Sequence, residues 1–165
     1  MGMQLDIASL AELEEVLGVL DEAAGWLKKV GVDDQWPSRF RPGMVAPAVE
    51  RGETWLARVN GAVVGTITLD WDDPLWADAE GTAGYVHRLA VRRSAAGRGA
   101  WLLDWAVGAT REQEREFVRL DCARSNRRLR SYYEDRGFQH HGDVPVGRRE
   151  QDGPMIWMSR YQLPL

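Results

Sequence analysis

Two glycines stand between an apolar strand-like run and an apolar helix-like run, an arrangement that can bind an anion. Leu89-Ala90-Val91 leads through small residues to Gly97-Arg98-Gly99, and an apolar helix is predicted to begin at once. Free amides at a helix N-terminus point at one spot, and the helix dipole favours negative charge there. The same glycines would also suit a tight strand-to-helix turn, so both interpretations stay open. The pattern G-x-x-x-x-G-K-[ST] is missing, which excludes a P-loop. Three predicted strands precede the one that leads into the loop, which excludes a dinucleotide-binding fold, whose glycines follow a first strand.

His87 is a second candidate for chemistry, because an imidazole with an ordinary pKa near 6.5 can remove a proton at neutral pH. Tyr85, His87 and Leu89 share one face of the predicted strand if that strand is regular. The alternative is that His87 packs against or caps the sheet beside Arg88. Its position therefore makes it a candidate base and not yet an assigned one.

The remaining histidines and the cysteine predict no metal site. His140 and His141 are adjacent on a predicted strand, so their side chains point to opposite faces and cannot chelate together. Cys122 is the only cysteine. It can form neither an internal disulfide nor a zinc site with local partners, and we expect it to be an inert buried side chain.

Eleven predicted elements in the order β-α-α-β-β-β-α-β-α-β-β position these residues. A capping box at Ser9–Glu12 opens the first helix, Asn60-Gly61 forms a hairpin turn, and Gly137 closes the last helix. Strands are predicted over 5–7, 54–59, 63–71, 85–91, 117–123, 138–144 and 155–161, and helices over 10–31, 42–49, 97–112 and 126–136. The pattern predicts a mixed α/β fold on a central sheet, and with no linker or repeat we expect one domain over residues 1–165.

Three segments in this order resemble the GNAT superfamily of acyl-CoA-dependent N-acyltransferases, over nearly the whole chain. The glycine loop resembles the family's R/Q-x-x-G-x-G/A pyrophosphate loop, and Arg119-Leu120-Asp121-Cys122 resembles its fifth strand. The segment from Asn126 to Phe138 resembles its N-x-x-A-x-x-x-Y-x-x-x-G-F helix. The loop departs from the pattern, because Ser94 stands where Arg or Gln is usual; a second register places Ala96 there and shortens the distance to the helix.

The resemblance implies a GNAT-like fold of the α/β (α+β mixed sheet) class. It implies a mostly antiparallel sheet of about seven strands, splayed between strands 4 and 5 and flanked by about four helices. It also implies acetyl-CoA as cofactor, with its pantetheine arm bonded along strand 4. The cofactor-binding residues are then Leu89, Ala90, Val91, Arg92, Ala96, Gly97, Arg98, Gly99, Ala100, Asn126 and Tyr133.

By the same resemblance, Tyr133 protonates the departing thiolate and a backbone amide near Leu89 meets the oxyanion. A phenol with a pKa near 10 suits donation to an alkyl thiolate of similar basicity. Tyr133 could instead be a core aromatic, as its neighbour Tyr132 illustrates. The general base is either His87, a nearby carboxylate or a water relay. Asn126 suits an N-cap of its helix as well as a pantetheine contact.

The resemblance places the acceptor against the N-terminal helices and the sheet, a region rich in aromatic and acidic residues. Aromatic faces with carboxylates suit a cationic amine, although the tryptophans could equally pack the core. Our candidates for acceptor contact are Trp26, Trp36, Trp71 and Tyr85; the region also holds Gln35, Phe40, Trp55, Trp76, Asp33, Asp34, Asp70, Asp72, Asp73 and Glu80.

The composition of the chain limits the classes of partner that we expect it to bind. The chain has 165 residues, a formal net charge of −4, and 44% hydrophobic and 28% charged residues. The acidic balance argues against a nucleic-acid binder, and no apolar run approaches the roughly 18 residues that span a bilayer. With no secretory signal visible, we expect a cytoplasmic protein. A homodimer is compatible with the sequence, which contains no feature that selects an oligomeric state.

The leading hypothesis is an N-acetyltransferase that moves an acetyl group from acetyl-CoA to a primary amine of a small cationic molecule, by direct attack in a ternary complex. A second hypothesis is a GNAT-like acyl-CoA sensor without efficient transfer. A third is an acetyltransferase of protein lysines or N-termini. An open groove in place of a tryptophan-lined pocket would favour the third.

Overall fold

A computed structural model describes residues 2–147 and 155–165. Seven strands of this part of the chain form one mixed sheet in the order β1-β2-β3-β4-β5-β7-β6. The strands are β1 (Gln4–Ile7), β2 (Thr54–Val59), β3 (Ala62–Asp70), β4 (Ala83–Val91), β5 (Phe117–Ala123), β6 (Gln139–Val146) and β7 (Ile156–Pro164). All neighbouring pairs are antiparallel except β4 and β5, which are parallel. The predicted mixed sheet of seven strands is confirmed.

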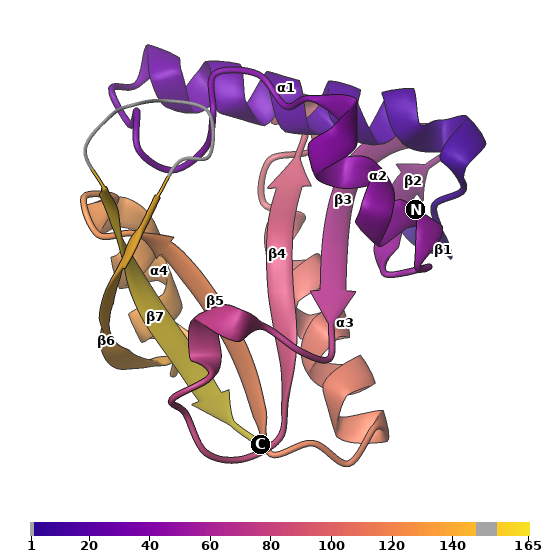
Figure 1. Ribbon diagram of the computed structural model, residues 1–165. Helices are drawn as coiled ribbons and strands as arrows, with labels where there is room; N and C mark the ends of the chain where they lie inside the picture. The colour runs from indigo at the N-terminus through magenta and orange to yellow at the C-terminus, as the bar shows by residue number, and fades with distance from the viewer. Residues whose placement is uncertain (1, 148–154) are drawn as a thin grey trace.

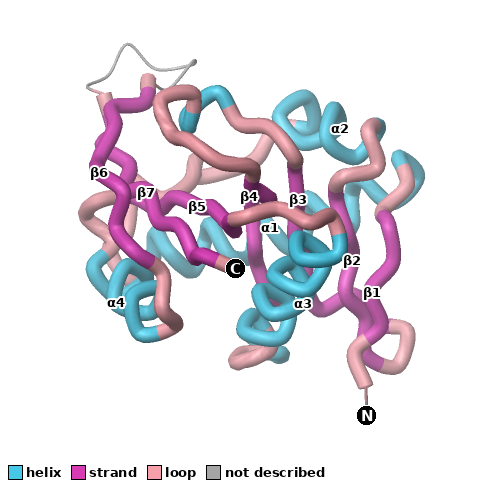
Figure 2. Tube along the Cα trace, turned by 90° about the horizontal axis from the view of Figure 1, so that it is seen from below, coloured by secondary structure: helices cyan, strands magenta, loops and turns pink. Residues whose placement is uncertain are grey.

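Helices cover both faces of the sheet. They are α1 (Leu13–Lys29), α2 (Pro42–Glu50), α3 (Gly99–Glu112) and α4 (Arg127–Asp135), with 3₁₀ turns at Leu10–Glu12, Pro74–Trp76 and Arg93–Ala95. Figure 2 shows α2 on one side of the sheet and α3 and α4 on the other. Along the described residues, no helix is both long enough and apolar enough to cross a membrane.

Two apolar clusters attach the helices to the sheet. Val16, Val19 and Leu20 of α1 pack with α2 and with Leu56 of β2. On the opposite face, Leu102 and Leu103 of α3 join Ile67 and other buried residues of the central strands. The fully buried side chains lie on the inner stripes of the helices, which is the reason their sequences show helical periodicity.

Local sequence signals end and begin the elements where they were predicted. The Ser9 amide donates to Glu12 Oε1 at 3.0 Å, which completes the capping box before α1. Asn60 and Gly61 have φ values of 51° and 81°, as a hairpin turn of this type requires. Gly137 follows α4 with φ of 91°, and Phe138 N donates to Tyr133 O at 3.0 Å. These confirmed turns fix where α4, and with it Tyr133, meets the sheet.

Candidate active site

The parallel strands β4 and β5 pair over a short distance and then separate. Ala83, Gly84 and Tyr85 are opposite Phe117, Val118 and Arg119. Beyond that point the two strands diverge toward α1 (Figure 1). The space between them opens into a cleft of about 1260 Å³, which exceeds the roughly 300–1,000 Å³ of an ordinary small-molecule pocket. A cleft of this size has room for two ligands together.

Nine of the residues predicted to form the site line this cleft. From β4 come His87, Leu89, Ala90 and Val91, and from α3 and α4 come Gly99, Asn126 and Tyr133. Trp26 of α1 and Trp36 of the following loop complete the set. The predicted cofactor, acid, base and acceptor residues therefore meet in one cavity.

A bulge at Arg88 decides which way the β4 side chains face. Thr66 is opposite Ala90 and Thr68 is opposite His87, so Arg88 and Leu89 share one partner on β3. Arg88 has φ of 51°, a value that is rare in a strand outside such irregularities. The strand is not regular, and the predicted common face for His87 and Leu89 is wrong, because Leu89 packs toward α3 while Ala90 packs toward α1.

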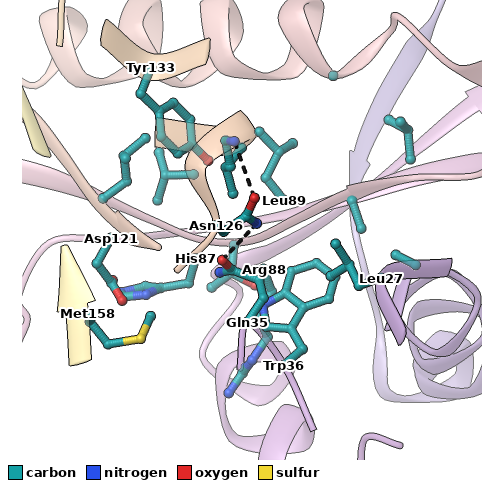
Figure 3. Close-up of a pocket in the computed structure, with 18 of the residues that line it drawn as sticks. Leu27, Gln35, Trp36, His87, Arg88, Leu89, Asp121, Asn126, Tyr133 and Met158 are labelled. Atoms are coloured by element: carbon teal, nitrogen blue, oxygen red, sulfur yellow. Dashed lines mark hydrogen bonds between the residues drawn. The ribbon is translucent and has the colours of Figure 1, made fainter. Parts of the chain in front are cut away.

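His87 is surrounded by carboxyl groups from three different segments. Its Nε2 lies 3.4 Å from Asp70 Oδ2 and 3.5 Å from Asp73 Oδ2. Ligand-type atoms of Asp73, His87 and Asp121 lie within 4.8 Å of one another. Figure 3 shows the imidazole beside the Asp121 carboxylate at one wall of the cleft. One positively charged group can contact all three residues at once.

The electrostatics of this cluster follow from its burial. Burial lowers the pKa of His87, and the positive charge of Arg88 acts in the same direction, while Asp73 opposes it. Burial, together with the nearby charge of Asp73, raises the pKa of Asp121 to about 7. His87 is therefore neutral at pH 7 and able to accept a proton, in a pocket that favours cations.

Tyr133 faces the same cleft from α4. Its ring packs against Phe138 and Tyr161 and is 6% exposed. Its hydroxyl points into the cavity (Figure 3) and makes no hydrogen bond to the described residues. Burial raises the pKa of Tyr133 above its usual range, so the phenol stays protonated at neutral pH. The hydroxyl is a proton donor without a partner, aimed at the ligand space.

Gln35, from the loop between α1 and α2, joins the two walls of the cleft. Its Oε1 accepts hydrogen bonds from Ala123 N at 2.9 Å and from Asn126 Nδ2 at 3.2 Å. Asn126 Oδ1 in turn accepts from Leu129 N at 3.2 Å, which confirms Asn126 as the N-cap of α4. Figure 3 shows Gln35 lying between Asn126 and the aromatic wall at Trp36.

The glycine loop offers free amides. The amides of Gly97, Gly99, Ala100 and Trp101 donate to no carbonyl or side chain of the described chain. A Cβ added at Gly97 or Gly99 would meet nothing within 4 Å, and Gly97 has φ of 94°. Gly97 thus needs a left-handed backbone, whereas Gly99 leaves open space beside the first turn of α3. Four unpaired amides around open space suit a phosphate group.

Other predicted site residues lie outside the cleft lining. Arg92 reaches back to α1 and β3, with Nη1 3.5 Å from Glu22 Oε1 and Nε donating to Val63 O. Trp71 lies under the guanidinium of Arg115, and Tyr85 Oη accepts a hydrogen bond from Arg119. Ala96, Gly97 and Arg98 belong to the loop beside the lining, and Ala100 to the first turn of α3. The cleft does not bring these side chains together with His87.

Comparison with known proteins places the chain in a family. A family model described as acetyltransferase (GNAT) family matches residues 21–138. The chain belongs to the GNAT acetyltransferases. An uncharacterized N-acetyltransferase, YesJ of Bacillus subtilis strain 168, is 29% identical over 142 residues, which are 79% of this chain and 78% of that protein. The protein is therefore an acetyltransferase, as the motifs predicted.

Solved structures agree with this acetyltransferase fold. A GNAT acetyltransferase from Listeria monocytogenes superposes with a TM-score of 0.77 at 26% identity, over 99% of this chain and 95% of that one. The Salmonella typhimurium protein yncA, solved with its cofactor acetyl-CoA, shares the fold with a TM-score of 0.69 at 15% identity, over 99% and 94%. The cofactor of the family, acetyl-CoA, fits the free amides of the glycine loop and the splayed strands, and it is the cofactor of this enzyme.

Three residues in or directly behind the lining of the cleft were not predicted from the sequence. Asp121 carried a signal, because it is a charged residue inside the otherwise apolar run of β5. Glu53 and Arg51, which form an ion pair at 3.0 Å behind Asp70, carried none, since they read as an ordinary turn between α2 and β2. Their relevance comes only from the pairing of β2 with β3.

Proposed function

We propose that this GNAT acetyltransferase transfers the acetyl group of acetyl-CoA to the primary amine of a small cationic molecule. The observation that carries the proposal is the cluster of His87, Asp73 and Asp121, which faces Tyr133 in the same cleft. Carboxylates attract an ammonium group, and a neutral imidazole beside them can remove its proton. The proposed enzyme is one domain over residues 1–165.

Size and shape support a small acceptor over a protein. Trp26 and Trp36 line the end of the cleft near α1. Arg93 covers the ring of Trp26 at 3.9 Å from the centroid, so that face of Trp26 is already occupied by a protein cation. A walled pocket of this kind suits a compact amine, whereas a protein lysine would require an open groove.

When bound, acetyl-CoA supplies a reactive acetyl thioester. In our proposal the amides of Gly99 and Ala100 hold its diphosphate, and the backbone of Leu89 and Val91 holds its pantetheine arm. The amide near Leu89 donates to the developing oxyanion. These backbone groups orient the acetyl thioester and polarise its carbonyl, and they transfer no proton.

Two side chains handle protons in the proposed mechanism. His87 takes the proton that the acceptor ammonium must lose before its nitrogen can attack. The Tyr133 hydroxyl gives a proton to the leaving thiolate. The acetyl group passes directly to the amine, because Cys122 is fully buried and burial raises the pKa of its thiol to about 12. A covalent acyl-cysteine step is thereby disfavoured.

A panel of amines with acetyl-CoA tests the proposal by following release of the free thiol. The panel contains diamines and polyamines, amino sugars, basic amino-acid derivatives, lysine peptides and an acidic amino acid. We expect the small cationic amines to react fastest. Asp121→Asn should raise their KM about tenfold, since it removes one charge from the cluster, while a neutral amine should lose less.

Other outcomes select the other hypotheses. Rapid turnover of lysine peptides with slow turnover of all small amines would identify a protein acetyltransferase. Thermal stabilisation by acetyl-CoA with no thiol release from any amine would identify an acyl-CoA sensor.

A further inference from the structure

Asp70 is an ionisable group in the cleft to which the proposed mechanism gives no part. It ends β3, and its Oδ2 lies 3.4 Å from Nε2 of His87. Its Oδ1 is buried and accepts no hydrogen bond within the described chain. A buried carboxyl oxygen without a donor is costly unless the carboxyl is neutral or shares a proton. Asp70 therefore needs an explanation beyond packing.

Glu53 lies against Asp70 and supplies that explanation. It precedes β2, is fixed by a backbone bond from Leu69 N to Glu53 O at 2.9 Å, and pairs with Arg51. Two carboxyls in contact share one proton, because both cannot ionise easily at close range. Arg51 stabilises the negative charge on Glu53, so the shared proton resides on Asp70.

We propose that Asp70, supported by Glu53 and Arg51, is a positioning residue that orients His87 and stabilises its imidazolium form during acetyl transfer. This inference rests on the proposed function, in which His87 is the base. Oδ2 of Asp70 and Oδ2 of Asp73 lie 3.4 and 3.5 Å from the same nitrogen, Nε2. Their contact keeps a proton on Nε2 and leaves Nδ1 free to receive another.

The proton balance is simple. An N–H bond of the acceptor ammonium breaks, and an N–H bond forms at Nδ1 of His87. The electron pair left on the amine nitrogen then attacks the acetyl carbon, and the bond from that carbon to sulfur breaks. The leaving thiolate takes the proton of Tyr133, and the second proton lost by the nitrogen replaces it. Above about pH 7, where Asp70 has lost its proton, its carboxylate holds the imidazolium, which carries both ring protons. The proton leaves to solvent after transfer.

The charged groups around Asp70 determine the pH at which it ionises and can support His87. Burial, the hydrogen bond with Glu53 and the charge of Glu53 raise the pKa of Asp70 to about 7, while Arg51 opposes this. The Asp70 proton lowers the pKa of Glu53. Asp73 faces Asp70 from the next loop, and His87 and Arg88 face it from β4. Asp70 is thus neutral below about pH 7 and ionised above it, so its support for His87 grows as pH rises through that range.

The first test measures kcat and KM against pH for wild type and Asp70→Asn, using the best amine of the panel. In wild type, kcat/KM should rise through about pH 7. Asp70→Asn should lose this step and lower kcat on its plateau about tenfold, less than the 10²–10⁴-fold typical for loss of a base itself. The KM for acetyl-CoA should not change. Asp6→Asn, on the exposed edge strand β1, is the charge-matched control.

Glu53→Gln provides the second test and remains informative if Asp70→Asn does not fold. Without the Glu53 charge, the pKa of Asp70 falls, so the step in kcat/KM should move to lower pH with its plateau retained. Asp121 also titrates near pH 7 and faces His87. Asp121→Asn should leave the midpoint of the step in place, because Glu53 acts on Asp70.

The ring signals of His87 in NMR spectra give a reading that needs no turnover. Its pKa should be lower in Asp70→Asn than in wild type, since a carboxylate beside Nε2 has been removed. If no amine is acetylated but this shift is seen, the proposed function fails and the Asp70–His87 coupling stands. An unchanged His87 titration together with an unmoved pH profile in Glu53→Gln overturns the inference, as does a pure rise in acceptor KM for Asp70→Asn.

Discussion

Polar groups have partners at one end of the β4–β5 pair and lack them at the other. We call the end where the two strands are hydrogen-bonded the paired end, and the end where they separate the open end. At the paired end, Arg119 is 1% exposed and donates to Tyr85 Oη, Gln162 Oε1 and the carbonyls of Glu80 and Gly81. At the open end, the Tyr133 hydroxyl and the amides of the glycine loop have no partner in the described chain. Native proteins satisfy buried polar groups, so a concentration of unmet ones marks where ligands bind.

The contrast extends to charge. Arg119 stacks near Trp76, with its guanidinium carbon 5.1 Å from the ring centroid, and Arg160 lies at the same distance. At the paired end, the guanidinium groups of Arg119 and Arg160 therefore both lie near the buried ring of Trp76. The open end collects the carboxyl groups of Asp70, Asp73 and Asp121 around His87. The polar groups of the paired end therefore have partners within the described chain, whereas the open end keeps unpaired groups available to ligands.

The largest effect should come from the open end, in Tyr133→Phe. Losing one general acid lowers turnover 10²–10⁴-fold. Phenylalanine keeps the ring that packs against Phe138 and Tyr161, so stability should change little. The measurement is kcat on one identified amine at saturating acetyl-CoA, together with calorimetric affinity for the cofactor, which should be nearly unchanged.

Tyr132→Phe is the matched control, because the adjacent helical side chain points about 100° away. It should retain most of the wild-type turnover. Wild-type turnover in Tyr133→Phe would mean that solvent or another group protonates the thiolate, and the assignment of Tyr133 would be wrong.

The next largest effect should come from the paired end, in Arg119→Met. Removing the guanidinium leaves the buried Tyr85 hydroxyl, Gln162 and the carbonyls of Glu80 and Gly81 without their donor, which we expect to lower the free energy of unfolding by about 3 kcal/mol. Denaturant melts would measure this loss. Acetyl-CoA affinity per folded molecule should be unchanged. Arg111→Met, at an exposed position of α3, should have little effect on stability. Equal losses in both variants would show that the Arg119 network is not special.

A smaller effect should follow from filling the glycine loop. Acetyl-CoA at 100 times its Kd should stabilise the fold by about 2.7 kcal/mol. Gly99→Val should reduce that stabilisation, because its side chain enters open space beside the free amides. Gly108→Val is a matched control in the same helix, where an added Cβ also meets nothing. Thermal melts with and without acetyl-CoA check both, and equal cofactor shifts would show that the loop is only a turn.

Much of the fold could be predicted because its signals are local. The capping box at Ser9, the turn at Asn60-Gly61 and the glycine after α4 each depend on residues within a few positions. The helix carrying Asn126 and Tyr133 combines such signals with family spacing, so both side chains could be placed at the cleft. Signals between neighbouring residues were therefore enough to predict the side of the cleft that α4 forms.

The side of the cleft formed by β4 and the acidic residues around His87 depends on pairing between segments that are distant in the sequence. The bulge at Arg88 exists because two β4 residues share one position opposite β3, and this turns Leu89 away from the face of His87. Asp73, His87 and Asp121 meet because a loop and two strands converge. Trp71 and Tyr85 have the residue types of an acceptor wall, yet both pair with arginines outside the cleft. The spacing of residues in the sequence does not predict the bulge at Arg88, the convergence around His87 or the arginine partners of Trp71 and Tyr85.

The smallest effect we predict tests whether the two walls are coupled through Gln35. Gln35→Leu removes the acceptor shared by Ala123 N and Asn126 Nδ2, leaving two donors unmet at a cost of about 1 kcal/mol. Because the same loop carries Trp36, the acceptor KM should rise severalfold while the kcat at saturation is retained. Gln35→Glu keeps an oxygen acceptor and should preserve most of the stability. Steady-state kinetics with varied amine, beside denaturant melts, measure both quantities. An unchanged acceptor KM in Gln35→Leu would mean that the loop is held by its other contacts, and that the open end of the β4–β5 pair binds its two ligands independently.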